Sequence, residues 1–400
     1  MACAHLVVTN TWGIINSFGL FQSHYTTTLS PARSPADISW IGSFQIFLLF
    51  FIGALTGRLT DAGYFRPVFS IGAALQILGI FTSSFAEQSY TYLFLSQGIA
   101  MGFGMGCMFC PTMAIISTYF AKRRSLAIGI VACGSATGGL IFPGMVRALL
   151  GRVGFAWTVR SVGLVQTVTL GISGLVIKPR VRVRARNLNS GSGSSSWLDL
   201  PAFKEGEYTL YTIGSFMCYL GVFFGFYYVA EFARRHVGMS YDDSLNLLLV
   251  INGIGSVGRL VPNYLADRFG PITVFAPTAA MAGICVLCWM AVDSVAGLYV
   301  WVVFYGFAAG GVQSLFPAGL SSLTADPGKA GVRMGMVFSI DSFATLVGPP
   351  IAGVLISQGG GSYWAAQVYA GVCMLAGAAF MVAARMVKVR RLGKGWKVKV

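Results

Sequence analysis

Long apolar stretches alternate with short polar segments along this whole chain. Each stretch is close to 20 residues, the length that a helix needs to cross a bilayer core of ~30 Å. A bilayer offers no partner for unpaired backbone groups, so each stretch is predicted to be a helix. Twelve candidate spans result: residues 4–26, 38–58, 67–86, 91–119, 125–146, 157–177, 208–231, 244–263, 271–292, 297–323, 334–357 and 365–386.

The polar and small landmarks between and within these stretches repeat with a constant offset. Asp61 recurs 206 residues later as Asp267, each in a similar loop segment. A collinear series of this kind predicts two homologous halves, and a membrane protein built of two parallel halves is typical of transporters with a site at the seam. Further pairs keep the same register: Gly104 and Gly310, Pro111 and Pro317, Gly129 and Gly335, and Pro143 and Pro349.

The repeat and the apolar pattern together predict the domain organisation. We expect an N-terminal six-helix bundle at 1–178 and a C-terminal six-helix bundle at 208–386. Between them, residues 179–207 combine alternating Arg and Val with a Gly/Ser tract, which is typical of a flexible cytosolic linker without a site of its own. Residues 387–400 form a basic cytosolic tail.

Composition supports the membrane prediction and narrows the partners. The 400 residues are 55% hydrophobic and only 10% charged, whereas a soluble domain has roughly 25% charged residues. The net charge of +15 could suggest nucleic acid. However, with both termini in the cytosol, all but seven of the 28 Lys and Arg residues fall in cytosolic loops and the tail. This positive-inside pattern excludes nucleic acid as a partner and favours anionic lipid headgroups.

Cofactor chemistry finds little support in the sequence. The eight cysteines fall inside predicted helices or, for Cys3, directly before one, and the surroundings of Cys107, Cys110, Cys285 and Cys288 supply no His or acidic co-ligand. Small packing residues are the better interpretation. The Gly-rich run at 102–106 follows no strand and has no phosphate-binding lysine, so it does not predict a nucleotide loop. We therefore expect no metal or other cofactor and no enzymatic activity.

Several segments resemble one known family. Residues 57–67 (GRLTDAGYFRP) and 263–271 (NYLADRFGP) resemble the loop motif of the major facilitator superfamily. Residues 10–19 (NTWGIINSFG), 37–40 (DISW), 117–127 (STYFAKRRSLA) and 348–353 (GPPIAG) resemble fungal monocarboxylate-transporter-like proteins. The resemblance implies an all-α membrane protein with twelve transmembrane helices in two pseudo-symmetric six-helix bundles, the major facilitator fold. It also implies a monomer in the plasma membrane.

The sequence departs from this family at two places. Members usually carry an acidic, Gly-rich stretch before the first helix, whereas this sequence starts at Met1-Ala-Cys-Ala. Animal monocarboxylate carriers resemble one another in an Asp one turn before the Arg of span eight, and here that place is Gly255, before Arg259. The Asp–Arg pairing of those carriers is therefore not expected in this chain.

Two charged residues lie deep in predicted helices and are the leading candidates for transport chemistry. A charge at mid-membrane costs at least ~2.5 kcal/mol and therefore needs a reason. In one interpretation, Arg259 binds a substrate carboxylate through two hydrogen bonds, and Asp341 acts as its counter-ion or as the proton-coupling group. In the other, Arg259 and Asp341 form a permanent structural pair, and the substrate binds elsewhere.

Neutral polar and aromatic residues on helices expected to line the cavity are weaker candidates, because such groups often serve as hydrogen-bonding links between helices. As possible substrate contacts we name Asn16, Tyr227, Asn252, Tyr305 and Gln313, with Gln97 less strongly supported. A second group is expected to act as a conformational latch, in which an acid near a helix end pairs with a loop arginine in one state only. Its members are Asp61, Arg66, Asp267 and Arg268.

The most direct functional hypothesis is secondary active transport by alternating access. The expected substrate is a small monocarboxylate or related organic anion, moved together with protons. The alternatives are an exporter or importer of a larger metabolite (riboflavin-like or a secondary metabolite) and a membrane sensor that does not transport. Gradient-driven accumulation of a substrate would separate the transporter hypotheses from the sensor.

Overall fold

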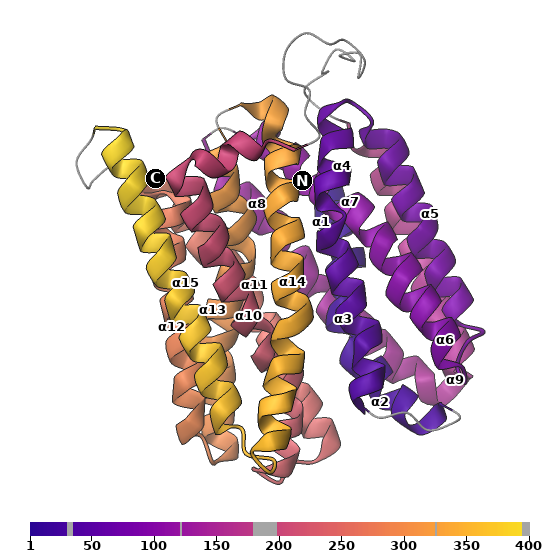
Figure 1. Cartoon of the computed structure of the whole chain (residues 1–400). Coiled ribbons are helices and arrows are strands. Elements are labelled where there is room, and N and C mark those ends of the chain that lie inside the picture. Colours follow the sequence, from indigo (N-terminus) through magenta and orange to yellow (C-terminus); the bar gives the residue numbers. More distant parts are fainter. Residues whose placement is uncertain (30–34, 121, 179–197, 325, 394–400) are drawn as a thin grey trace. The chain divides into compact units, whose positions relative to one another are not determined.

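The computed structural model describes residues 1–29, 35–120, 122–178, 198–324 and 326–393 (Figure 1). All regular elements in these ranges are helices, and no strand occurs there. The all-helical prediction is therefore confirmed for the described chain. Of the predicted linker (179–207) and tail (387–400), residues 179–197 and 394–400 lie outside the described residues.

The first half of the sequence forms helices that follow the predicted stretches closely. Three stretches are interrupted by a single residue, Ser17 in the first, Ile52 in the second and Cys133 in the fifth. The fourth stretch contains a π-helical segment, η1. The bounds are α1 Ala2–Asn16, α2 Phe18–Thr28, α3 Pro35–Phe51, α4 Gly53–Asp61, α5 Phe65–Ser83, α6 Tyr90–Leu93, η1 Phe94–Met101, α7 Gly102–Tyr119, α8 Arg124–Ala132 and α9 Gly134–Val176.

The second half forms longer, less interrupted helices. Short 3₁₀ segments precede α10 and α14 and follow α12. The bounds are η2 Leu200–Lys204, α10 Gly206–Arg235, α11 Tyr241–Phe269, α12 Pro271–Cys288, η3 Trp289–Ala291, α13 Val295–Leu323, η4 Pro327–Lys329, α14 Ala330–Gln358 and α15 Trp364–Arg391.

Ten helical segments of the described chain are long and apolar enough to cross a membrane. One of them, Arg124–Val176, contains two predicted spans, because Gly154 with φ of 75° and ψ of 173° breaks the helix between them. Only glycine adopts this backbone conformation easily. The α1–α2 pair corresponds to the first predicted span, so the helices account for all twelve predicted stretches.

The chain divides into two compact units. The first contains Met1–Tyr119, Gly134–Asp199 and Asp326–Ser342, and the second contains Phe120–Cys133, Leu200–Ala325 and Phe343–Val400. Each unit thus includes a short segment from the opposite sequence half. The two exchanged segments begin at positions that the 206-residue repeat relates, since Phe120 corresponds to Asp326.

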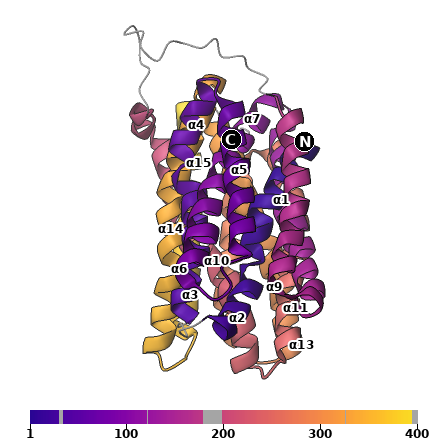
Figure 2. The same ribbon diagram turned by 90° about the vertical axis from the view of Figure 1, so that its right-hand side faces the viewer.

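Small residues allow the helices of each unit to approach closely. In the first unit α9 runs alongside α1 (Figure 2), and a Cβ atom built on Gly13 would lie only 2.6 Å from the Cα of Gly138. In the second unit a Cβ built on Gly310 of α13 would lie 2.9 Å from the Cα of Gly255 on α11. Contacts this short require glycine at 13, 138 and 310, and such close packing is what lipid-embedded bundles favour.

Candidate functional site: a buried guanidinium and helix-capping carboxylates

Arg259 is the most deeply buried cation of the candidate site. It lies on α11 in the second unit and is only 1% exposed. Eight residues separate it from Asp267, which places it about 12 Å along the helix at ~1.5 Å per residue. Its Nη2 donates a hydrogen bond of 2.8 Å to Oε1 of Gln313 on α13. Within the described residues, this hydrogen-bond partner is a neutral amide, so it does not balance the guanidinium charge.

The backbone around Arg259 is fixed by contacts among three helices of the second unit. Asn263 Nδ2 donates to the Arg259 carbonyl oxygen over 2.8 Å and to Ser314 Oγ over 2.7 Å. Directly after α8, Cys133 Sγ donates to the Ser256 carbonyl oxygen over 3.5 Å. These contacts hold α8, α11 and α13 together at the depth of the guanidinium, so the helix that carries Arg259 is well positioned.

The other predicted substrate contacts of the second unit differ in their surroundings. Asn252 is 2% exposed and its Nδ2 donates to the Leu248 carbonyl oxygen of its own helix over 3.0 Å. Tyr305 is fully buried, donates its hydroxyl to the Val222 carbonyl oxygen and stacks on Trp301 with ring centroids 4.7 Å apart. Tyr227 of α10 is half-buried. The structure therefore brings Arg259 and Gln313 into direct contact and places Tyr305 in an aromatic cluster.

The remaining candidates belong to the first unit. Asn16 is half-buried, and its Nδ2 donates to the Ser135 carbonyl oxygen over 3.2 Å. Gln97, in the π-helical segment, accepts a 2.7 Å hydrogen bond from the hydroxyl of Tyr25. Asp341 is 0% exposed and lies in the part of α14 that belongs to the first unit. Because Arg259 belongs to the second unit, the pairing of Asp341 with Arg259 stays a prediction.

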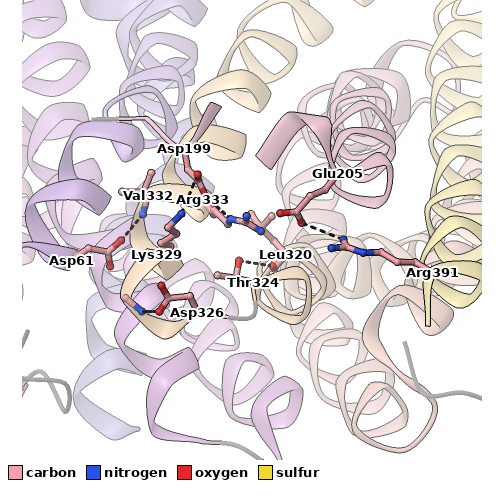
Figure 3. A network of polar contacts seen from close by, with 11 residues as sticks. Asp61, Asp199, Glu205, Leu320, Thr324, Asp326, Lys329, Val332, Arg333 and Arg391 are labelled. Atoms are coloured by element: carbon pink, nitrogen blue, oxygen red, sulfur yellow. Dashed lines mark hydrogen bonds and ion pairs between the residues drawn. The ribbon is translucent and has the colours of Figure 1, made fainter. Parts of the chain in front are cut away.

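Asp61 caps the amino-terminal end of α14 within the first unit (Figure 3). Its Oδ1 accepts a hydrogen bond from the Gly331 N–H over 3.0 Å, and its Oδ2 accepts one from the Val332 N–H over 2.8 Å. The first N–H groups of a helix have no partner inside the helix and carry its positive dipole end. A carboxylate there satisfies two of them and is favoured by the dipole.

Asp267 makes the corresponding contact within the second unit. Its two oxygens accept hydrogen bonds from the Ser125 and Leu126 N–H groups, both over 2.9 Å, at the start of α8. The 206-residue offset relates Asp61 to Asp267, and it also relates Ser125 and Leu126 to the two amides that Asp61 caps. The repeat is therefore visible in atomic contacts as well as in sequence.

The two predicted latch arginines differ in their surroundings. Arg66 is exposed, while Arg268 lies over the ring of Tyr264, 4.6 Å from its centroid, and donates to the hydroxyl of that ring. The hydrogen bonds described for Asp61 and Asp267 go to backbone amides instead. The pairing of these carboxylates with loop arginines in one of two conformational states stays a prediction.

Sequence reasoning missed a third carboxylate, Asp199. Its Oδ2 accepts from Arg333 Nε over 2.8 Å and its Oδ1 from Lys329 Nζ over 3.3 Å, in the first unit (Figure 3). Burial alone would raise the pKa of Asp199, but the hydrogen bonds and charges of Arg333 and Lys329 outweigh it and lower the pKa below its usual value. The only sequence signal was an acid near the end of a basic linker.

Among the described residues, no group of three or more His, Cys, Asp or Glu side chains could hold a metal ion. The side chains described above offer charge and hydrogen bonding. One cation lies deep in the second unit with a neutral partner, and two repeat-related carboxylates cap helix ends. These are the elements that binding of an anion and a change between two conformations would use.

Comparison with known proteins identifies the family. Residues 1–332 and 256–397 match the model of the Major Facilitator Superfamily. An MFS-type transporter of Gibberella zeae is 47% identical over 390 residues, which cover 97% of this chain and 86% of that protein. The aspyridones efflux protein apdF of Emericella nidulans is 33% identical over 388 residues, covering 97% of this chain and 77% of that protein.

Solved structures agree on the fold. The E. coli fucose:proton symporter FucP superposes with a TM-score of 0.75 at 16% identity, covering 95% of this chain and 97% of that chain. The monocarboxylate-porter subfamily expected from the sequence stays a prediction, since the relatives include proteins named for efflux of secondary metabolites. The chain is a multi-pass membrane transporter and belongs to the major facilitator superfamily.

Proposed function

We propose that this protein exports an anionic secondary metabolite by alternating access and uses a proton gradient as its energy source. Two relatives that cover most of the chain are named as efflux proteins, one for aspyridones and one for agnestins. The direction of transport and the class of substrate are proposed by analogy with these relatives. The anionic character of the substrate is inferred from this chain's own residues.

The observation that carries the proposal is the buried guanidinium of Arg259 with its neutral partner. A cation inside a membrane bundle is expensive unless an opposite charge accompanies it during part of the cycle. Gln313 Oε1 takes one N–H of the guanidinium and supplies no charge. A carboxylate or another delocalised oxyanion on the substrate would complete the pair through charge-assisted hydrogen bonds. Arg259 and Gln313 are thus the proposed anion-binding residues.

The other site residues take secondary roles in this proposal. Asn16 and Tyr227, both half-buried, contact the rest of the substrate. Asn252 and Tyr305 shape the site from buried positions, with hydrogen bonds to backbone carbonyls. Asp341, fully buried on α14, is the proposed coupling group. A buried carboxylate that gains and loses a proton links substrate movement to the proton gradient.

Asp61 and Asp267 are the proposed conformational latch of this cycle. Each caps a helix that the sequence places in the opposite half of the chain. Alternating access requires an element with two states, and a helix end that is capped in one state and released in the other provides it. In this proposal, Arg66 and Arg268 pair with anionic lipid or with the carboxylates after release.

A second candidate is proton-coupled symport of a small monocarboxylate. The same observation favours it, because a guanidinium recognises any carboxylate irrespective of what else the molecule carries. The two candidates differ in the size of the substrate and in the direction of net transport. In both, we propose a monomer in the plasma membrane with both termini cytosolic, lipid as the only other partner, and no enzymatic or sensor role.

The test is transport in proteoliposomes with an imposed proton gradient, using a panel that runs from lactate and benzoate to larger acidic metabolites and their neutral esters. We expect gradient-dependent accumulation of acids and no accumulation of esters, and loss of transport in Arg259→Gln. Arg160→Gln is the matched control, because Arg160 also lies in a membrane helix but donates to Ser84 and stacks on Trp157. Equal transport of acids and esters, or full activity of Arg259→Gln, would contradict the proposal.

A further inference from the structure

We infer that Gly255 and Gln313 determine the position of the Arg259 guanidinium and thereby the affinity of the transporter for anions. This inference rests on the proposed function, in which Arg259 binds the anionic group of the substrate. It adds a specificity-determining position, Gly255, which has no side chain. Three observations within the second unit carry it.

The first observation concerns the space above Gly255. Gly255 lies one helical turn before Arg259 on α11, so the two residues share a face of the helix. A Cβ atom built on Gly255 would lie 2.6 Å from Nη1 of Arg259, much closer than two such atoms can approach. The guanidinium therefore folds back over the bare backbone of Gly255, and any side chain at 255 must displace it.

The second observation is that this displacement would be local. Apart from the guanidinium, the nearest atom to that Cβ is the Gly306 carbonyl oxygen at 3.5 Å, an ordinary contact. The backbone of α13 thus tolerates a methyl group at 255. The flexible end of the Arg259 side chain does not, and its movement would strain or break the 2.8 Å hydrogen bond to Gln313.

The third observation is the character of the partner on α13. Oε1 of Gln313 accepts a hydrogen bond from Nη2. The N–H groups of Nη1 and Nε are left to donate to other acceptors. A neutral amide orients the guanidinium without neutralising it. A carboxylate at position 313 would orient it equally well but would also supply the opposite charge, and would then compete with the substrate anion.

The experiment compares Gly255→Ala with Gly253→Ala, a matched control two residues away on the same helix, where an added Cβ would meet no atom within 4 Å. The probes are radiolabelled benzoate and lactate in proteoliposomes. For Gly255→Ala we expect a KM raised about tenfold, the loss of roughly one good hydrogen bond, with maximal rate and melting temperature unchanged. Gly253→Ala should match the wild type. Gln313→Glu should raise KM further, and Gln313→Asn should partly retain affinity.

The outcomes separate this inference from the proposed function. If Arg259→Gln abolishes uptake while Gly255→Ala and Gln313→Glu keep the wild-type KM, the positioning role is wrong and the anion site stands. If Gly255→Ala lowers the maximal rate and the melting temperature at constant KM, Gly255 serves helix packing only, and the inference again fails. If Arg259→Gln transports either probe as fast as the wild type, the carboxylate-binding function itself is wrong.

A second inference comes from independent contacts of the first unit. We propose that Asp199 is an additional latch on the start of α14, the helix end that Asp61 caps (Figure 3). Arg333, one of its partners, follows directly after Val332, whose N–H donates to Asp61. Both carboxylates therefore hold the same helical turn, one through the backbone and the other through side chains.

This second latch has no counterpart in the repeat. The offset of 206 residues places Ala127 where Arg333 would be, and Asp199 lies in the segment between the two sequence halves. The start of α14 is thus held by an added ion pair of 2.8 Å, contributed by the end of the segment that joins the two sequence halves. This asymmetry would stabilise the capped state of α14 beyond what the repeat alone provides.

The test compares Asp199→Asn with Asp326→Asn, an exposed carboxylate nearby that accepts from the Gly328 N–H of its own turn. We expect Asp199→Asn to lower the maximal transport rate several-fold at constant KM and Asp326→Asn to leave both unchanged. Exchanging the charges in Asp199→Arg/Arg333→Asp should restore part of the rate. A wild-type rate in Asp199→Asn, or no recovery in the exchanged pair when each protein is folded by its melting temperature, would overturn the proposal.

Discussion

Replacing either capping aspartate should change the rate of the transport cycle and leave substrate affinity alone. Asp61→Asn removes the charge and one of two acceptor oxygens, because an amide nitrogen cannot accept from the Val332 or Gly331 N–H. Losing a net hydrogen bond to a charged group costs about 1.5–3 kcal/mol, and the helix dipole adds ~0.3–1 kcal/mol. We take about 2 kcal/mol for this partly exposed site. At that value, the population of the capped state of α14 relative to the released state falls about 30-fold.

Because the repeat relates two capping aspartates, the prediction must hold for two separate variants. Asp267 accepts from the two repeat-related amides of α8 at 2.9 Å, so Asp267→Asn should have an effect of the same size. The assay is initial-rate transport in proteoliposomes over a range of substrate concentrations, with Asp326→Asn as the control. We expect both variants to lower the maximal rate about tenfold or more at constant KM. A normal rate in either variant, or a rise in KM equal to the fall in rate, would refute the latch reasoning.

Three smaller predictions follow from individual contacts. Gly258→Ala should lower the melting temperature clearly, since its Cβ would lie 2.0 Å from the Phe307 carbonyl oxygen and overpacking of this kind costs about 1–3 kcal/mol. Asn263→Ala should destabilise by only about 1 kcal/mol, measured as thermal or detergent-induced unfolding, because interhelical hydrogen bonds such as that to Ser314 are weak in membranes. Asp199→Asn should change transport by the same factor at every pH from about 5 to 8, because the pKa of Asp199 is lowered below 3.8 and its stabilisation disappears only as the pH falls through that lower value.

The sequence predicted the number and place of the helices well because a bilayer leaves few choices. Apolar stretches of the required length must become helices, and the observed helices account for every predicted one. The interruption of the first span was not predicted. Ser17 donates its hydroxyl to the Gly13 carbonyl oxygen over 2.6 Å, and such back-bonding bends a helix without leaving an apolar or polar signal in the sequence.

From the sequence, a residue of the candidate site could be predicted only where its own type and place in an apolar stretch are unusual. Arg259 was evident because an arginine deep in an apolar stretch is costly. Its contact with Gln313 depends on how α11 and α13 pack, which no periodicity in either helix specifies. In the sequence, Gly255 was notable only because animal monocarboxylate carriers have an Asp at that place. Its role in making room for the guanidinium follows from the 2.6 Å between an added Cβ and Nη1 of Arg259, a distance that requires coordinates.

The capping contacts show why local sequence could not identify the partners of Asp61 and Asp267. Each carboxylate meets backbone N–H groups, which every residue except proline has, so the identity of Gly331 or Ser125 carries no signal. The 206-residue repeat indicates the partners instead. If the two halves descend from one sequence and exchange corresponding helix starts, a cap in one half must have its counterpart 206 residues away, and both pairs obey that offset. Asp199 falls outside the repeat, and for that reason its effect on transport can be measured separately from the two capping pairs.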